Sequence, residues 1–131
     1  MGNLDKERRR KVIQIEYNKD KVKEQCTSVK AAKKLFGGDV SLTTSLLARI
    51  NALANADSIR DIIVQPKFRF HALHGKLEGY FAIDVKTIKE PWRIILQPLD
   101  ENMQPYNPCN IDEISGIVRI VEITEVSKHY E

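Results

Sequence analysis

The chain has 131 residues, of which 42% are hydrophobic and 30% charged, the composition of a globular protein with one ordinary domain. No apolar run approaches the roughly 18 residues that a membrane helix needs, and the charged start of the chain is not followed by the apolar stretch of a secretory signal. Cys26 and Cys109 are too few for a disulfide framework and lack the spacing of zinc ligands, so we expect a cytoplasmic protein that crosses no membrane and holds no metal or cofactor.

Charge is distributed unevenly along the chain. Residues 1–35 hold 11 Lys or Arg against 5 Asp or Glu, net +6, whereas residues 36–131 hold 10 against 13, net −3. We assign residues 1–10 to a basic, flexible N-terminal arm and residues 11–131 to one folded domain. Such an arm attracts phosphate backbones without reading their sequence. A solvated helix face with a frayed terminus would account for the same charges.

The first half of the folded domain has one strand and two amphipathic helices. Residues 12–17 are rich in β-branched side chains and predict a strand. Asn18 is the expected cap of a helix that continues to Leu35-Phe36 and ends at Gly37-Gly38. A second helix is expected from Asp39 to about residue 54. The apolar side chains that recur at helical spacing, and that we expect in the core, are Val22, Cys26, Leu46, Leu47, Ile50 and Leu53.

The second half of the domain changes to the period of β-strands. A short helical turn at residues 57–62 ends before Pro66, and strands are expected at residues 68–71, 80–85, 92–97 and 117–123. Helices followed by strands predict an α+β fold, with an antiparallel sheet of four to five strands that carries the helices on one face. Residues 98–116 contain three of the five prolines and no Lys or Arg, and a connection of this length is either functional or mobile.

One segment of this sheet region has a distinctive sequence. Residues 68–84 read Phe-Arg-Phe-His-Ala-Leu-His-Gly-Lys-Leu-Glu-Gly-Tyr-Phe-Ala-Ile-Asp, and residues 91–96 read Pro-Trp-Arg-Ile-Ile-Leu. Gly75 and Gly79 indicate turns that shape a hairpin, because no helix follows them as it would in a phosphate-binding loop. Trp92 and Tyr80 stand among apolar residues of alternating strands, which favours the core over a role as base-stacking platforms.

This succession resembles the core of HigB-like toxins in the RelE superfamily. The pattern of the family is approximately R-x-H-x-L-x-G-x-x-x-G-x-[YFW]-[AS]-[IL] followed by [WY]-R-[IL]-x-F. Residues 26–37, 48–59 and 114–123 also resemble, in order, the first-helix, second-helix and last-strand regions of such toxins. The resemblance implies a RelE-like fold, with two N-terminal helices packed on a curved antiparallel sheet.

The resemblance also implies an activity and partners. Toxins of this family are ribosome-dependent mRNA endonucleases of type II toxin–antitoxin pairs, so the implied substrate is mRNA on the ribosome. In the implied reaction a base activates the ribose 2′-hydroxyl, which attacks the adjacent phosphate without a metal. The implied protein partner is a HigA-like antitoxin with a helix-turn-helix domain, and operator DNA would be bound only through that antitoxin.

Two motif residues match the chemistry of this reaction. His71 aligns with the histidine of the family and is the first choice for proton transfer, since the pKa of histidine lies near cellular pH. The alternative is a half-buried strand residue bonded to nearby backbone. Arg93 aligns with the strand arginine, whose planar fork suits a phosphate and its transition-state charge. The alternative there is an arginine paired with a carboxylate.

The C-terminus departs from the family pattern, in which the last strand runs into Asp-Tyr-His. Aligned without a gap, these positions are residues 125–127, whereas a two-residue insertion places them at residues 127–129. We prefer the second alignment because it keeps His129 as a catalytic candidate, although a frayed terminus would account for it equally well. The further candidates for RNA binding are Arg69, His74, Lys76 and Tyr130. His74 stands where the family usually has lysine, which favours either contact with phosphate or a simple role in capping a turn.

Two other functions remain open. The first is a RelE-fold binding module without nuclease activity, either a component that acts only in a complex or a gyrase-poisoning toxin like ParE, which the missing Asp-Tyr pair favours. The second is a small antitoxin-like DNA-binding protein, which is disfavoured because the sequence contains no helix-turn-helix pattern.

Overall fold

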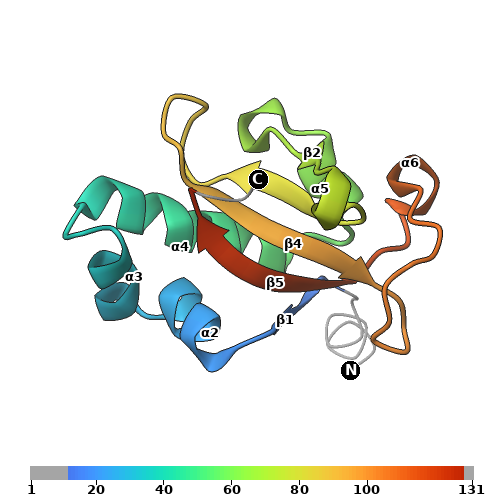
Figure 1. Ribbon diagram of the computed structural model, residues 1–131, viewed down its shortest axis with the longest axis horizontal. Helices are drawn as coiled ribbons and strands as arrows, with labels where there is room; N and C mark the ends of the chain where they lie inside the picture. The colour runs from blue at the N-terminus through green and yellow to red at the C-terminus, as the bar shows by residue number, and fades with distance from the viewer. Residues whose placement is uncertain (1–11, 129–131) are drawn as a thin grey trace, which may run out of the picture.

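A mixed sheet of five strands, in the order β1-β5-β4-β3-β2, forms the centre of the protein (Figure 1). The structure is a computed structural model and describes residues 12–128, so the predicted basic arm lies outside the described residues. The strands are β1 (Gln14–Tyr17), β2 (His71–Ala72), β3 (Phe81–Asp84), β4 (Arg93–Leu99) and β5 (Ile120–Ser127). The two long strands β4 and β5 lie side by side through the middle of the molecule, with α2, α3 and α4 on the left and α6 on the right in Figure 1.

The sheet is not wholly antiparallel, which corrects the expectation from sequence. Strands β2 to β5 are joined to their neighbours in antiparallel pairs, but β1 pairs with β5 in parallel, from Gln14 opposite Ile120 to Tyr17 opposite Ile123. Strand direction is visible in a sequence where a short turn joins two strands, because a hairpin must be antiparallel. No such turn joins β1 to β5, which stand at opposite ends of the chain.

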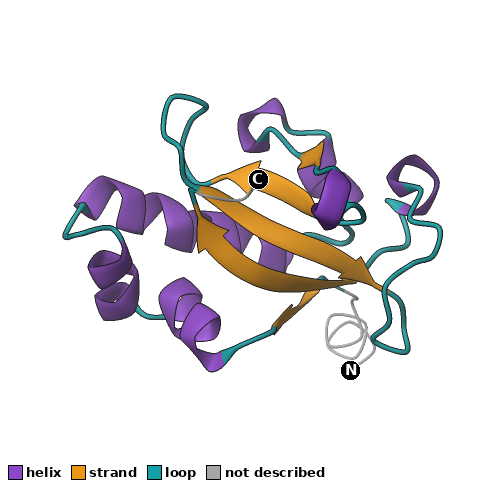
Figure 2. Cartoon of the chain, viewed as in Figure 1, coloured by secondary structure: helices purple, strands orange, loops and turns teal. Residues whose placement is uncertain are grey.

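The described residues contain five α-helices (Figure 2). They are α2 (Asp20–Thr27), α3 (Val29–Leu35), α4 (Val40–Asn55), α5 (Arg60–Ile63) and α6 (Ile111–Ile114). The single helix expected before Gly37 is wrong, because Ser28 interrupts it with an extended backbone. The Ser28 hydroxyl accepts the Ala31 N–H at 3.2 Å and so caps α3, a use of serine that competes with an uninterrupted helix. Asn18 is not the cap of α2, which begins after Lys19.

The second predicted helix is confirmed, and its start has a clear physical cause. The Asp39 carboxylate accepts the Leu42 N–H at 3.0 Å, which satisfies one of the free donors at the first turn of α4. Leu46, Ile50 and Leu53 of this helix are buried, whereas Leu47 is half-buried. Burial of one face of α4 therefore follows the apolar spacing read from the sequence.

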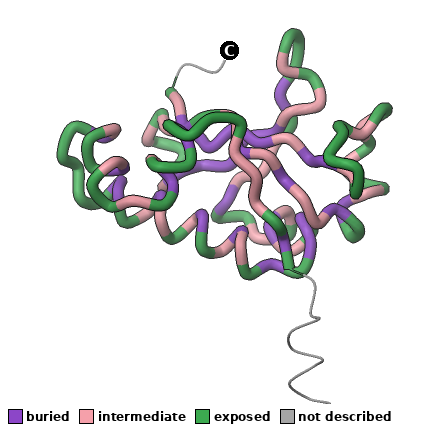
Figure 3. The backbone as a smooth tube through the Cα atoms, turned by 90° about the horizontal axis from the view of Figure 1, so that it is seen from below, coloured by how far each residue is buried: buried purple, intermediate pink, exposed green. Residues whose placement is uncertain are grey.

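The two faces of the sheet are packed differently. Alternate strand residues such as Ile83, Ile94 and Leu96 join the main core, which also contains Val22 and Cys26 of α2. The residues between them face the opposite side, where Leu73, Ala82 and Ile95 form a smaller apolar cluster under Leu77 and Tyr80. In Figure 3 many of the buried segments accordingly lie toward the middle of the molecule, and exposed segments lie at its ends.

Two segments between the strands differ from the sequence prediction. Residues 68–71 do not form one strand, since Pro66–Phe68 is a 3-10 turn (η1) and Arg69 adopts a left-handed backbone with φ of 47°. Proline at the start of the turn fixes a helical φ, and the left-handed residue then redirects the chain, so that only His71 and Ala72 pair as β2. The connection expected at residues 98–116 lies instead at residues 100–119, because β4 continues through Leu99 and β5 begins only at Ile120, and α6 occupies part of it.

Candidate functional site

His71 is held at the edge of the sheet with one ring nitrogen engaged. It pairs with Ala82 across β2 and β3, and its Nδ1 lies 2.7 Å from the carbonyl oxygen of Arg69. Because a carbonyl oxygen only accepts hydrogen bonds, this contact assigns the proton of the neutral ring to Nδ1. The Nε2 atom then carries the lone pair and can accept a proton. The alternative interpretation, a half-buried strand residue bonded to nearby backbone, also expects this contact. The contact is therefore compatible both with that interpretation and with proton transfer by His71.

A groove beside β2 brings together three of the residues chosen from the sequence. It is lined by residues 71–77 and has a volume of about 690 Å³. We call it the histidine groove. His71, His74 and Lys76 all line it, and no acidic residue does. Gly75, with φ of 64°, opens the 3-10 turn η2 (Gly75–Leu77), which follows His74 and contains Lys76. The groove therefore offers one half-buried imidazole together with an exposed imidazole and an exposed ammonium group.

Arg93 shares a sheet face with His71 but is committed to other contacts. Cross-strand partners point to the same face, and the pairs His71–Ala82 and Asp84–Arg93 stand two residues apart on β3. Arg93 is only 6% exposed, and its Nε lies 3.0 Å from Oδ1 of Asp84 in an ion pair. The rest of the guanidinium donates to three backbone carbonyls of the β3–β4 connection, those of Ile88, Glu90 and Trp92. The observed contacts of Arg93 are thus those of the arginine paired with a carboxylate, and its role toward phosphate stays a prediction.

Asp84 is the centre of this cluster and was not chosen from the sequence. Its carboxylate is 2% exposed and also binds Nε of Arg69, at 3.1 and 3.0 Å from its two oxygens. A buried carboxylate is tolerated only where cations or N–H donors compensate its charge. The signal that would have indicated it is an acidic residue at the end of the apolar run Phe81-Ala82-Ile83, with an arginine in the motif on either side.

A third arginine, Arg49 of α4, ties the helix layer to the same region. Its Nε donates to the backbone carbonyl of Asp84 at 3.0 Å. Its Nη2 donates to the backbone carbonyls of Lys86 at 3.0 Å and of Lys67 at 3.3 Å. Burial lowers the pKa of Arg49 and the Asp84 charge opposes that shift. Arg69, which we expected to bind RNA, is one of two arginines that pair with the Asp84 carboxylate, and 35% of its side chain is exposed.

The structure describes only part of the C-terminal region in which we expected catalytic residues. His129 and Tyr130 lie outside the described residues. The register places Glu125 opposite Ile95, in the same cross-strand row as Ala82 and His71, so its side chain belongs to the histidine face of the sheet. Glu125 is exposed. A carboxylate on this face makes the surface less positive than the sequence hypothesis of a cationic cleft requires.

The two strand aromatics have different surroundings. Trp92 packs edge-on against Phe36 with ring centroids 5.0 Å apart, in the main core, as the sequence indicated. Tyr80 is half-buried above the smaller apolar cluster and lines a second groove on the surface. Both rings are half-buried, and Tyr80 is the one that lines a groove.

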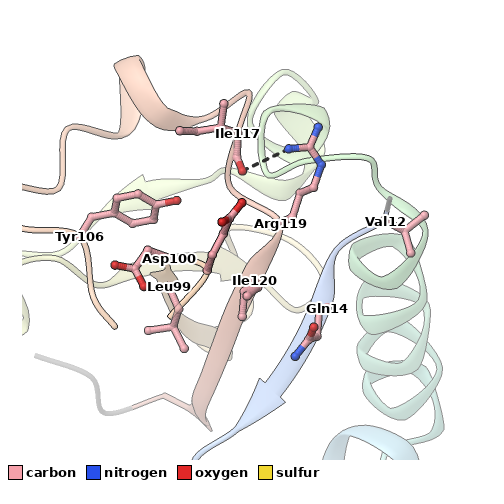
Figure 4. Close-up of a pocket in the computed structure, with 9 residues that line it drawn as sticks. Val12, Gln14, Leu99, Asp100, Tyr106, Ile117, Arg119 and Ile120 are labelled. Atoms are coloured by element: carbon pink, nitrogen blue, oxygen red, sulfur yellow. Dashed lines mark hydrogen bonds between the residues drawn. The ribbon is translucent and has the colours of Figure 1, made fainter. Parts of the chain in front are cut away.

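Another groove lies near the start of β1 and β5 and contains no residue of the predicted site (Figure 4). Its volume is about 350 Å³, and Asp100, Tyr106, Ile117 and Arg119 are among its lining residues. Arg119 donates to the carbonyl of Ile117 at 3.4 Å. Burial, followed by the charge of Asp100, raises the pKa of the Tyr106 phenol. This groove mixes both signs of charge and does not by itself indicate a ligand.

No family model matches the chain, and no curated protein matches it. Between residues 12 and 128, no helix combines the length and apolarity that a membrane crossing requires. Within the same residues, no group of three or more His, Cys, Asp or Glu side chains is arranged as metal ligands.

Proposed function

We propose that this protein is a HigB-like toxin of the RelE superfamily, a cytoplasmic, ribosome-dependent mRNA endonuclease. The observation that supports the proposal best is the histidine groove, in which His71 presents a free Nε2 beside His74 and Lys76. A histidine base next to two potential cations is what cleavage of RNA by its own 2′-hydroxyl requires. The α+β sheet with helices before it agrees with the RelE-like fold that the sequence resembles.

In the proposed reaction, Nε2 of His71 removes the proton of a ribose 2′-hydroxyl. The 2′-oxygen attacks the adjacent phosphorus, the bond to the 5′-oxygen of the next nucleotide breaks, and that oxygen takes a proton from an acid. The products are a 2′,3′-cyclic phosphate and a free 5′-hydroxyl. His74 and Lys76, which line the same groove, would hold the charge of the phosphate. His129 stays our candidate for the acid and Tyr130 for RNA contact, and Arg93 would reach phosphate only by leaving Asp84.

The proposed partners follow from the proposed class. The toxin would bind mRNA on the ribosome and would be neutralised by a HigA-like antitoxin with a helix-turn-helix domain. The complex of the two would bind operator DNA through the antitoxin. The reaction needs no cofactor, because the nucleophile is part of the substrate.

A second candidate function is a RelE-fold binding module without nuclease activity, such as a gyrase-poisoning toxin like ParE. The observation that favours it is the commitment of Arg93 to Asp84 and to three carbonyls, which leaves the family's phosphate ligand occupied. Glu125 on the histidine face favours it as well.

Regulated expression of the full chain in bacteria separates these functions. The nuclease proposal predicts growth arrest with mRNA breaks that map to translated regions and disappear when translation initiation is blocked. His71→Ala should reduce the cleavage rate on the order of 10²–10⁴-fold, the usual contribution of a proton-transfer group. Val64→Ala, at an exposed side chain outside the groove, is the matched control and should leave cleavage unchanged. Intact mRNA with a DNA-damage response would refute the nuclease and support the gyrase-type candidate.

A further inference from the structure

The described surface has one region of strongly positive charge, the helices α2 and α3. Residues 19–35 contain six lysines and two acidic residues, net +4, and all six lysines are exposed. The other described residues contain ten Lys or Arg and thirteen Asp or Glu, net −3. A polyanion is therefore attracted to this pair of helices before any other part of the described surface.

A groove runs along these helices, and we call it the lysine groove. One part, of about 350 Å³, lies between Lys21 of α2 and Lys34 of α3. The other part, of about 520 Å³, begins at Lys19 and Lys21 and crosses to β5 at residues 124–126. The two parts share Lys21, Gln25 and Leu35 in their linings, so they form one continuous depression.

The groove is open where it meets the sheet because β1 is short. β1 pairs with one edge of β5 only as far as Ile123, whereas β4 pairs with the other edge of β5 as far as Ser127. The helix region and this part of β5 therefore line one groove, which is formed by Lys19, Lys21 and Leu35 on one side and by residues 124–126 on the other. Because Glu125 belongs to the sheet face that carries His71, the groove leads from the helices to that face.

The lysine groove adjoins the histidine groove through one residue. Leu77 lines both, and Tyr80 lies on the lysine side of that junction. A path thus leads from Lys34 and Lys21 past the ring of Tyr80 to Lys76 and His71. Cations at both ends with an aromatic ring between them are the elements with which proteins bind single-stranded nucleic acid.

We propose that the lysine groove binds the single-stranded RNA that flanks the scissile phosphate, with Lys19, Lys21 and Lys34 on the backbone and Tyr80 stacked on a base. The inference rests on the proposed function, since it extends the binding surface of the same site. An acidic peptide would also match the lysines. RNA is favoured because Tyr80 offers a stacking surface and because the groove leads to a histidine suited to a 2′-hydroxyl. Glu24 and Glu125 also line it, and they repel both ligands.

The test measures binding without cleavage. The full chain is titrated into a fluorescein-labelled 12-nucleotide RNA with 2′-O-methyl groups, which lacks the nucleophile, and anisotropy is followed at several salt concentrations. Single-stranded RNA releases about 0.7 ion for each phosphate neutralised. Three contacts therefore contribute a slope of about 2 in log affinity against log salt, and on the order of 10² in affinity at about 0.1 M salt.

The groove variant is Lys19→Gln/Lys21→Gln/Lys34→Gln. The matched control, Lys23→Gln/Lys30→Gln/Lys33→Gln, removes the same charge from the same two helices at lysines that do not line the groove. The groove variant should lose about 10²-fold in affinity and about 2 in slope, and the control only a small fraction of either. Tyr80→Leu should lose at least about fivefold while Tyr80→Phe, which keeps the ring, retains binding.

Each other outcome has a definite meaning. Equal losses in the two triple variants would overturn the proposal in favour of diffuse attraction, and so would no loss in either. If the groove variant no longer bound a labelled 12-residue polyglutamate but still bound RNA, the proposal would be overturned in favour of an acidic protein partner. RNA binding that depends on the groove in a chain that breaks no mRNA in cells would support the groove and reject the nuclease.

Discussion

The buried cluster around Asp84 makes a sharp prediction about stability. Asp84→Asn removes the charge that compensates Arg93, whose side chain is 7% exposed and cannot turn to solvent without disrupting the β3–β4 connection. Breaking a buried ion pair from one side typically costs about 3–5 kcal/mol, because the remaining charge stays buried and unpaired. The ion pair of Arg69 with Asp84 contributes less to this loss of stability, because 35% of the Arg69 side chain is exposed to solvent. The expected loss is a large part of the roughly 5–15 kcal/mol that stabilises an ordinary domain.

Urea unfolding followed by tryptophan fluorescence measures this loss directly. Trp92 is the single tryptophan of the chain and packs against Phe36 in the core, so its emission reports global unfolding. With a slope of about 2 kcal/mol per molar urea, the midpoint of Asp84→Asn should fall by about 2 M. Glu101→Gln removes an exposed carboxylate instead and should stay within about 0.5 kcal/mol of the wild type.

A loss below about 1 kcal/mol in Asp84→Asn would refute the reasoning, since it would mean that Arg93 finds water or another partner when the carboxylate is neutral. The same experiment bears on function. Arg93→Ala should destabilise the fold by a similar amount, because Asp84 then loses its most buried partner. Any loss of activity in Arg93→Ala must therefore be corrected for the fraction of protein that is folded.

Three further changes test the core, a helix start and the response to pH. Leu53→Ala leaves a cavity at a fully buried position of α4 and should lower the free energy of unfolding in urea by about 2–5 kcal/mol. Asp39→Ala removes the N-terminal cap of α4 and should lower the same free energy by about 1 kcal/mol, whereas Asp39→Ser should stay close to the wild type. Burial raises the pKa of the Cys26 thiol from 9.0 to about 12, and burial together with Cys26 raises the pKa of Tyr17 to about 12. The unfolded chain releases these protons first, so stability should be complete below pH 9 and fall between pH 9 and about 12, with a smaller fall in Cys26→Ala. A thiol reagent should label half-buried Cys109 in the native protein and reach Cys26 only on unfolding.

Much of the fold follows from local patterns in the sequence. The limits of α4 agree with the prediction to about one residue, because Asp39 supplies a cap and the apolar spacing fixes the buried face. Strands β3 and β4 lie within the predicted runs or extend them by two residues. Local patterns did not reveal the break at Ser28, since a serine inside a lysine-rich helix looks acceptable until its hydroxyl is seen to cap the following turn.

The candidate site was harder to predict for a physical reason. The motif indicated His71, His74 and Lys76 as neighbours, and they share a groove because a short turn connects them. The partner of Arg93 depends on register, since Asp84 is brought opposite it only when β3 and β4 pair. An arginine that could bind phosphate and an arginine that completes a buried ion pair have the same sequence signature.

The parallel pairing of β1 with β5 has a consequence for how the chain folds during synthesis. β1 leaves the ribosome among the first described residues, but its only sheet neighbour, β5, is made about a hundred residues later. Closing so long a loop is entropically costly and slow, and it comes after the helices and the β3–β4 hairpin have had time to form. A nascent chain that lacks its last strand leaves β1 and one side of β4 without partners, both of them exposed edges for wrong pairing. The described sheet is therefore completed by β5, late in translation.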